Sequence, residues 1–150
     1  MKVIVPQTDA EIKEHYRIRY ETLRMPWGQP PGSERDGEET DNVLASAYNE
    51  AGECLGVARM LPLNDGSIQI RSMGVLESAR GQGVGKAVLA FLETKAAEMG
   101  KSLLVLHARE NAVPFYKSTG YRVVSESYVL WGIIPHFKME KSLKMRTKSL

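Results

Sequence analysis

The chain has 150 residues, with 20 Lys and Arg against 18 Asp and Glu, and a single cysteine. That length fits one domain with one hydrophobic core. One cysteine excludes an internal disulfide and a zinc site built from several cysteines, and the three scattered histidines show no metal-ligand spacing, so we expect no bound metal. No run of about 18 apolar residues occurs, so we expect no membrane-spanning helix and no membrane partner.

The surplus of positive charge lies at the C-terminus. Residues 141–150 contain four basic residues and no acid, so the rest of the chain is slightly negative. A nucleic-acid-binding protein usually has a basic face, and this sequence has only a basic tail, so we expect no nucleic-acid partner. We expect a single domain over 1–141, a disordered basic tail over 142–150, and a cytoplasmic location, because the N-terminus is too short and too charged for a secretion signal.

The first half of the sequence predicts one helix and four strands. Thr8 and Glu11 have the spacing of a capping box, so we expect a helix from there to about Leu23. Prolines and glycines from Pro26 onward end this helix and begin a polar loop over about 25–42. The predicted strands are 2–5, 43–49, 54–61 and 67–75. Short turns join the last three strands, which predicts an antiparallel meander.

The second half begins with a glycine-rich turn over residues 80–85. This turn precedes a helix whose apolar face runs from Val84 to Met99 and which ends at Gly100. The remaining predicted elements are a buried strand over 103–106, a short helix capped by Asn111 and ended by Gly120, and strands over about 121–130 and 133–141. This order of elements predicts an α+β fold with a mixed sheet.

The glycine turn has the features of an anion-binding site. Glycine permits positive φ and close backbone approach, and the backbone N–H groups of such a turn, with a helix N-terminus, bind anions. Arg80 and Lys86 add positive charge at its ends. The Walker loop does not fit, because Arg80 and Ala87 stand where it needs glycine and Ser or Thr. The dinucleotide fingerprint does not fit either, because Lys86 stands where it needs glycine.

Two motifs resemble those of the GNAT superfamily, the acetyl-CoA-dependent N-acetyltransferases. Residues 80–85 follow the pattern Arg-x-x-Gly-x-Gly of its pyrophosphate-binding motif, and residues 111–121 resemble its second signature, an Asn followed by Phe-Tyr and then Gly-Tyr. The resemblance covers essentially the whole chain. It implies a GNAT-like fold, a central mixed, mostly antiparallel sheet flanked by about four helices. Residues 69–75 and 132–136 are further similar to an ElaA-like bacterial subgroup.

The resemblance implies direct transfer of an acetyl group from acetyl-CoA to a primary amine of a small molecule or peptide. It maps the pyrophosphate site onto Arg80, Gly81, Gln82, Gly83, Val84, Gly85 and Lys86. It maps the pantetheine contacts onto Asn111 and onto the strand of Met73, Gly74 and Val75, whose backbone also polarises the thioester carbonyl. It maps the general acid onto Tyr116, because a phenol is neutral at pH 7 and can donate to the leaving thiolate.

For the acceptor site the sequence offers acids in the polar loop and one histidine. The loop acids are Glu34, Asp36, Glu38, Glu39 and Asp41. They form either a solvated charge run or a surface that attracts a cationic amine, and for the second reading we assign Glu38, Glu39 and Asp41 to the acceptor site. His136 joins them because it lies in the motif shared with the ElaA-like subgroup.

The general base remains open between these residues and His15. We expect His15 at the helix surface, His107 as a hydrogen-bonded residue at a strand end, and Cys54 as a structural residue, since no base is positioned beside it.

Two other classes of protein fit part of this sequence pattern. A CoA- or acyl-CoA-binding sensor would keep the fold without turnover, and a nucleotide-binding protein would use the same glycine turn. The sheet edge at the late strands can also pair in a homodimer.

Overall fold

The computed structural model describes residues 1–37 and 39–143. Its strands are β1 (Lys2–Ile4), β2 (Val43–Tyr48), β3 (Cys54–Pro62), β4 (Ile68–Val75), β5 (Leu103–Arg109), β6 (Arg122–Leu130) and β7 (Ile134–Ser142). Its α-helices are α1 (Asp9–Leu23), α2 (Val84–Glu98) and α3 (Val113–Ser118), and short 3-10 helices occur at Met25–Trp27, Glu77–Ala79 and Glu110–Ala112. Each predicted strand and helix is present close to its expected bounds.

The strands form one seven-stranded sheet in the order β1-β2-β3-β4-β5-β7-β6. Only β4 and β5 pair in parallel, and α2 is the crossover between them. This arrangement confirms the predicted α+β fold and its mixed, mostly antiparallel sheet. The described residues form three α-helices rather than about four, because Pro26 and Gly28 limit the segment after α1 to a single 3-10 turn.

The capping box at the start of α1 is confirmed. Thr8 Oγ1 accepts a hydrogen bond from the Glu11 N–H at 3.1 Å, and Glu11 Oε1 accepts one from the Thr8 N–H at 3.1 Å. The helix that starts there directs His15 and Arg19 toward the sheet, where both are buried. The expectation of a surface position for His15 was wrong, because β2 supplies Ser46 as a buried hydrogen-bond partner.

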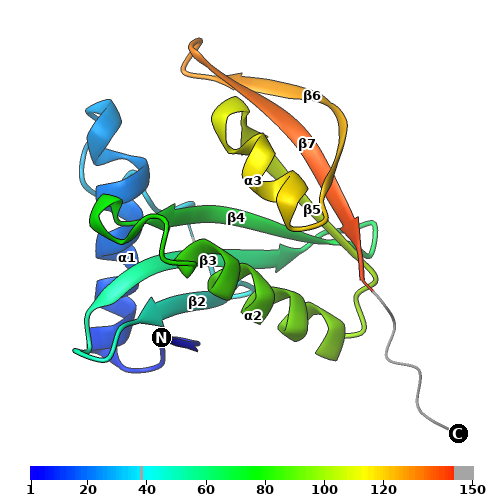
Figure 1. Cartoon of the computed structure of the whole chain (residues 1–150). Coiled ribbons are helices and arrows are strands. Elements are labelled where there is room, and N and C mark those ends of the chain that lie inside the picture. The colour runs from blue at the N-terminus through cyan, green and yellow to red at the C-terminus, as the bar shows by residue number, and fades with distance from the viewer. Residues whose placement is uncertain (38, 144–150) are drawn as a thin grey trace, which may run out of the picture.

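The helices α1 and α2 cover opposite faces of the first half of the sheet (Figure 1). Side chains alternate between faces along a strand, so Ala45 and Ala47 pack in the same core as α2, whereas Ser46 faces α1 and bonds His15. The α2 side chains in this core are Val84, Val88, Leu89, Leu92 and Ala96. The third helix, α3, packs against β5 and β6 on the second half of the sheet.

The sheet opens between β4 and β5. These strands pair only near their beginnings, at Ile68–Gln69 and Leu104–Val105. Beside Ser72, whose φ is 56°, the pairing of β4 with β3 shifts register, which marks a β-bulge that bends β4. The two halves of the sheet then diverge into the V seen in Figure 1. The backbone edge of β4 at Met73–Val75 therefore has no pairing with β5.

The late strands leave β6 at the edge of the sheet, because β7 lies between β5 and β6. The exposed apolar side chains on β6 include Val123, Val124, Tyr128 and Val129. A homodimer formed through the late strands stays a prediction, and the observed order limits it to β6, since β7 is paired on both sides.

The last strand extends slightly past residue 141, and the domain boundary stays a prediction. Ser142 is the last residue of β7, and the Leu143 N–H donates to the Ser102 carbonyl at 2.8 Å while its side chain packs against the core. Residues 144–150, the remainder of the predicted tail, lie outside the described residues. Within the described ranges, no helix has the length and apolar character needed to cross a membrane.

Candidate active site

A cavity of about 750 Å³ lies where β4 and β5 separate. It is lined by nearly all the residues predicted for the cofactor site, namely Met73, Gly74, Val75, Arg80, Gly81, Gly83, Val84, Gly85, Lys86 and Asn111, and also by Tyr116. Gln82 is the one predicted residue outside this lining, and its side chain donates to the Ser78 carbonyl at 3.3 Å. We call this space the glycine-turn cavity.

The N-terminus of α2 forms one end of the glycine-turn cavity. Gly81 and Gly83 have φ values of +79° and +81°, which strain other residues, and a Cβ on either would meet nothing within 4 Å. The first backbone bond of the helix runs from the Ala87 N–H to the Gly83 carbonyl, so the preceding N–H groups have no partner within the helix. With Arg80 and Lys86 in the same lining, this end is suited to an anion.

A second cavity, of about 600 Å³, adjoins the first. Its basic lining residues are Arg24, Arg71, Arg109, His107 and His136, and we call it the arginine cavity. Asp36 is the only carboxylate among the described residues that line it. The two cavities share the lining residues Leu23, Met73, Arg109, Ala112 and Tyr116, so they meet at these side chains.

Tyr116 therefore stands at the junction of the two cavities. It is 8% exposed, and its hydroxyl donates to the thioether sulfur of Met73 at 3.5 Å. Because a thioether is a weak acceptor, the hydroxyl remains available to a stronger partner. Burial raises the pKa of Tyr116 to about 12, against the opposing effect of Arg109, so the phenol is protonated at neutral pH.

His136 in β7 presents an unprotonated ring nitrogen. Its Nδ1 lies 2.9 Å from the Ile134 carbonyl, and a carbonyl only accepts, so Nδ1 carries the proton and Nε2 of the neutral ring does not. The ring stacks on Tyr128 with centroids 4.4 Å apart. Burial lowers the pKa of His136, which keeps the ring neutral at pH 7. His136 is thus a possible proton acceptor in the arginine cavity.

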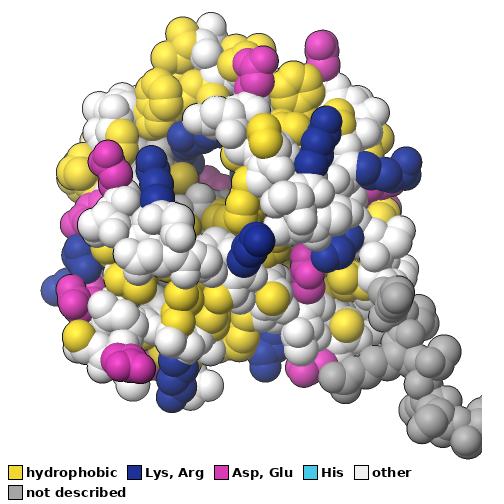
Figure 2. All heavy atoms as spheres, in the orientation of Figure 1, with side chains coloured by type: hydrophobic (Ala, Val, Ile, Leu, Met, Phe, Trp, Pro, Cys, Tyr) yellow, Lys and Arg dark blue, Asp and Glu magenta, His cyan; other side chains and the backbone are white. Residues whose placement is uncertain are grey.

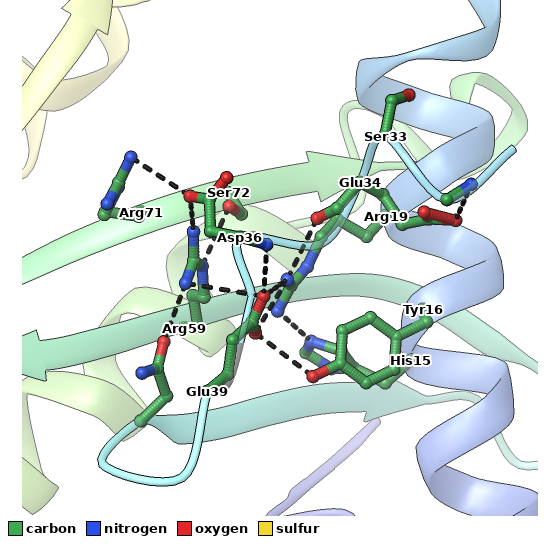
Figure 3. Close-up of polar contacts among 12 residues, drawn as sticks. His15, Tyr16, Arg19, Ser33, Glu34, Asp36, Glu39, Arg59, Arg71 and Ser72 are labelled. Carbon is green, nitrogen blue, oxygen red and sulfur yellow. Dashed lines mark hydrogen bonds and ion pairs between the residues drawn. The ribbon is translucent and has the colours of Figure 1, made fainter. Parts of the chain in front are cut away.

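A network of charged side chains, buried at Arg19, Glu39 and Arg59, joins α1 to the loop before β2 (Figure 3). Both carboxylate oxygens of Glu39 accept from Arg19 Nη1 at 2.9 Å, and Oε2 lies 3.6 Å from Arg59 Nη1. Asp36 Oδ2 accepts from Arg59 Nη2 at 2.6 Å and lies 3.2 Å from Arg71 Nη2. Because Asp36 and Arg71 line the arginine cavity, the network ties the conformation of the loop to the shape of that cavity.

The described acids of the loop differ in exposure. The Glu39 side chain is 4% exposed and bonded to Arg19, so its charge is neutralised inside the protein. Asp41 is exposed and lines neither cavity. Glu38 lies outside the described residues. The assignment of Glu39 to the acceptor site stays a prediction, although its charge is engaged by buried arginine partners that the sequence did not reveal.

Two local predictions change as well. Asn111 does not cap α3, whose N-cap is Ala112 without a side-chain bond, because the 3-10 turn Glu110–Ala112 leads directly into the helix. His107 lies inside β5 rather than at its end, with Nδ1 2.6 Å from Ser127 Oγ. Cys54 is a buried residue in β3, and burial raises the pKa of its thiol to about 11, which agrees with a structural role.

Sequence reasoning missed the three arginines of the arginine cavity and the contribution of α1. Arg109 is the last residue of β5, one of the two strands of the parallel crossover. A side chain at the carboxyl end of such a strand lies at the edge of the sheet where sites form, and this position was a usable signal. Arg71 lies in the middle of β4 and carries no such signal. No comparable signal existed for Arg24, because its position depends on how the end of α1 packs.

The burial of His15 predicts a stability that depends on pH. Nδ1 bonds Ser46 Oγ at 3.0 Å and Nε2 accepts from Arg19 at 3.0 Å. Burial, followed by the Arg19 charge, lowers the pKa of His15 to about 3 from an ordinary value of 6.5. Between pH 6.5 and about pH 3, His15 binds a proton in the unfolded chain but not in the folded chain. Stability is therefore fully present above pH 6.5 and falls below it, by up to about 1.4 kcal/mol per pH unit.

Urea unfolding of the wild type and of His15→Gln between pH 7.5 and 5 measures this effect. The amide of Gln can accept from Arg19 but does not titrate, so the variant should lose less stability on acidification than the wild type. Equal slopes of unfolding free energy against pH in the two proteins would show that His15 does not cause the dependence.

Known proteins share both the sequence pattern and the fold. Residues 33–143 match the acetyltransferase (GNAT) domain family. YjcF, an N-acetyltransferase of Bacillus subtilis (strain 168), is 34% identical over 141 residues, covering 94% of this chain and 99% of YjcF. An aminoglycoside 6'-N-acetyltransferase complexed with coenzyme A has the same fold, with a TM-score of 0.81, 16% identity, and coverage of 99% of this chain and 100% of that chain. Escherichia coli ElaA gives a TM-score of 0.77 at 23% identity, covering 93% and 97% of the two chains.

The mixed sheet of this chain, which opens between two parallel strands, thus has the fold of these solved acetyltransferases. The chain belongs to the GNAT acetyltransferase family. The family resemblance inferred from the two sequence motifs is confirmed, and the protein is an acetyltransferase of GNAT type.

Proposed function

We propose that the protein binds acetyl-CoA in the glycine-turn cavity and transfers the acetyl group directly to a primary amine in the arginine cavity. The observation that carries this proposal is the meeting of the two cavities at Tyr116. Transfer from a thioester to an amine needs an anion cradle for the donor, an acid at the sulfur and a proton acceptor near the amine. Residues suited to each of these tasks lie along the two adjoining cavities.

The glycine-turn cavity supplies the groups that would hold acetyl-CoA. The N–H groups at the start of α2, with Arg80 and Lys86, suit the pyrophosphate. The backbone edge of β4 at Met73–Val75, which is not paired with β5, suits the amides of the pantetheine arm and can polarise the thioester carbonyl through an N–H group. Asn111 lines the same cavity and is positioned to contact the pantetheine.

In this proposal Tyr116 and His136 move the protons. His136 Nε2 takes a proton from the amine nitrogen as the N–C bond to the carbonyl carbon forms. Tyr116 donates its hydroxyl proton to the sulfur as the C–S bond breaks, which leaves an amide and a free thiol. Exchange with water then returns a proton to Tyr116 and removes one from His136. Arg109 lines both cavities and favours the transient negative charge on Tyr116.

Direct transfer is favoured because neither candidate nucleophile is suitably placed. Cys54 lines neither cavity, and its pKa of about 11 keeps the thiol protonated at neutral pH. Ser72 lines the arginine cavity, but its Oγ accepts from Arg59 Nε at 3.1 Å. A guanidinium cannot serve as a base for that hydroxyl.

Release of free thiol from acetyl-CoA in the presence of a panel of amines tests the proposal. Double-reciprocal plots of the initial rate, with both substrate concentrations varied, should give intersecting lines, because both substrates must be bound together. Parallel lines would indicate an acetylated enzyme intermediate. Binding of CoA without turnover of any amine would identify a CoA-binding sensor. Stabilisation by ATP or NAD instead of CoA would identify a nucleotide-binding protein.

The glycine turn gives a prediction about CoA binding. CoA should raise the unfolding free energy by about 2–4 kcal/mol at a hundred- to thousand-fold excess over Kd. Gly83→Asp should abolish this gain, because it places a negative charge where the pyrophosphate would bind. Thermal unfolding with and without CoA measures the effect.

Gly52→Asp is a matched control for that variant. Gly52 has a φ of +80° and open space around its Cβ position, like Gly83, but it lies in the turn between β2 and β3. It should suffer the same backbone strain and still respond to CoA. A normal CoA response in folded Gly83→Asp would show that the anion site lies elsewhere.

A further inference from the structure

The arginine cavity is strongly cationic. Arg24, Arg71 and Arg109 line it, and Asp36 is the one carboxylate in the described lining. Asp36 is shared between Arg71, at 3.2 Å, and Arg59, which donates to it at 2.6 Å from outside the lining. On the face drawn in Figure 2, basic side chains lie inside the hollow between the two halves of the molecule. The cavity therefore has an excess of positive charge.

Two of these arginines have no carboxylate within ion-pair distance among residues 1–37 and 39–143. Arg24 donates only to backbone carbonyls, and Arg109 makes neither an ion pair nor a side-chain hydrogen bond there. Their guanidinium carbons instead lie over indole rings, Arg24 5.6 Å from Trp131 and Arg109 5.7 Å from Trp27. Arg24 and Arg109 line the same cavity, and burial, followed by the Arg24 charge, lowers the pKa of Arg109. Such a pair is suited to an anion supplied by a ligand.

We propose that the acceptor carries an anionic group, a carboxylate or a phosphate, in addition to its amine, and that Arg24, Arg71 and Arg109 bind that group. This inference rests on the proposed function, because it concerns the acceptor of the same transfer. An amino acid or an amine with a similar pattern of charge fits the cavity. A polyamine does not fit, because its second ammonium group would face three guanidinium groups.

The same charges favour the reactive form of the amine. A positive environment disfavours a further positive charge, so a bound ammonium group loses its proton more readily. That first proton is lost to water, and His136, which lies in the same cavity with Nε2 unprotonated, takes the second proton as the N–C bond forms. The cavity thus suits an acceptor whose carboxylate or phosphate binds the arginines and whose amine nitrogen attacks in its neutral form.

Matched amines that differ only in one charged group test the inference. The first set is 4-aminobutyrate, 3-aminopropylphosphonate, butylamine and putrescine, and the second is leucine and leucinamide. In at least one set, kcat/KM for an anionic member should exceed that for its neutral or cationic counterpart by about tenfold or more, the effect of one charge-assisted hydrogen bond. Comparison of kcat/KM for 4-aminobutyrate and 3-aminopropylphosphonate shows whether the cavity prefers a carboxylate or a phosphate-like group.

Charge reversal at Arg71 gives a second test. Arg71→Glu loses the half-exposed ion pair with Asp36, but Arg59 still holds Asp36, so the variant should fold. Because Arg71 lines only the arginine cavity, the response to CoA should be kept. The variant should lose the preference for the anionic amine and gain activity toward putrescine. Arg122→Gln is the control, because Arg122 is 77% exposed on β6 and lines neither cavity, so its substrate preference should not change.

The outcomes separate this inference from the proposed function. Equal kcat/KM values within both sets, unaltered by Arg71→Glu, would overturn the inference and leave amine acetylation intact. If CoA binds but no amine is acetylated, the proposed function fails. Calorimetry on the CoA complex then compares N-acetyl-4-aminobutyrate with N-butylacetamide as probes of the cavity. Tighter binding of the anionic probe supports an anion site, and equal affinity overturns it.

Discussion

Tyr116→Phe should lower kcat by about 10²-fold, within the range that general acid–base catalysis contributes. The substitution keeps the ring, its T-shaped contacts with Phe115 and Tyr121, and therefore the packing of the junction. The lost hydroxyl donates only to the Met73 sulfur in the described structure, so little stability should be lost. Affinity for CoA should change little, because the anion site at α2 is untouched. Steady-state kinetics and a CoA-dependent melt measure both quantities.

Tyr121→Phe is the matched control for this experiment. Tyr121 is a buried neighbour of Tyr116 that lines neither cavity, and its hydroxyl donates to Glu93 at 2.8 Å. Removing that hydroxyl should cost about 1–3 kcal/mol of stability and leave kcat unchanged. The two variants thus separate catalysis from folding. A wild-type rate in Tyr116→Phe would show that another group or water protonates the thiolate.

Glu39→Gln should reduce the unfolding free energy by about 3–5 kcal/mol, the effect of removing one member of a buried ion pair. Arg19 is 1% exposed, and the variant would leave its guanidinium buried without a carboxylate. Burial raises the pKa of Glu39, but the Asp36 N–H and Arg19 outweigh this and hold the pKa below its ordinary value. The stabilisation by the ion pair is therefore present above pH 4.5 and is lost as the pH falls through that lowered value.

Urea unfolding of Glu39→Gln beside Asp41→Asn measures this effect. Asp41 is an exposed acid of the same loop, so its replacement should change stability by no more than about 0.5 kcal/mol. Adding Arg19→Met to Glu39→Gln should recover part of the loss, because it removes the uncompensated buried charge. If Glu39→Gln and Asp41→Asn reduced the unfolding free energy by similarly small amounts, Glu39 would contribute no more to stability than a solvated surface acid.

Features set by local chemistry were predicted well from the sequence. The capping box of Thr8 and Glu11 starts α1 as expected, because its hydrogen bonds join residues three apart. The glycine turn opens α2 with Gly81 and Gly83 at positive φ. The residues predicted for the cofactor site lie along one cavity, apart from Gln82, because this turn and the end of β4 are close in the chain as well as in space.

Features set by packing between distant segments were not predicted. The burial of His15 depends on Ser46 in β2, and the position of Glu39 depends on Arg19 and Arg59 in two other elements. The insertion of β7 between β5 and β6 follows from the pairing of strands and has no local signal. As a result the sequence offered a negative loop surface as one reading of these acids, whereas the cavity next to Tyr116 is lined by three arginines.

A crystal structure with CoA tests the central claim most directly, namely that donor and acceptor cavities meet at Tyr116. The account predicts the pyrophosphate against the backbone N–H groups at the start of α2 and the pantetheine along Met73–Val75. It places the thiol sulfur about 3–3.5 Å from the Tyr116 hydroxyl, at the mouth of the arginine cavity. A thiol directed away from Tyr116, or a pyrophosphate bound outside the glycine turn, would contradict it.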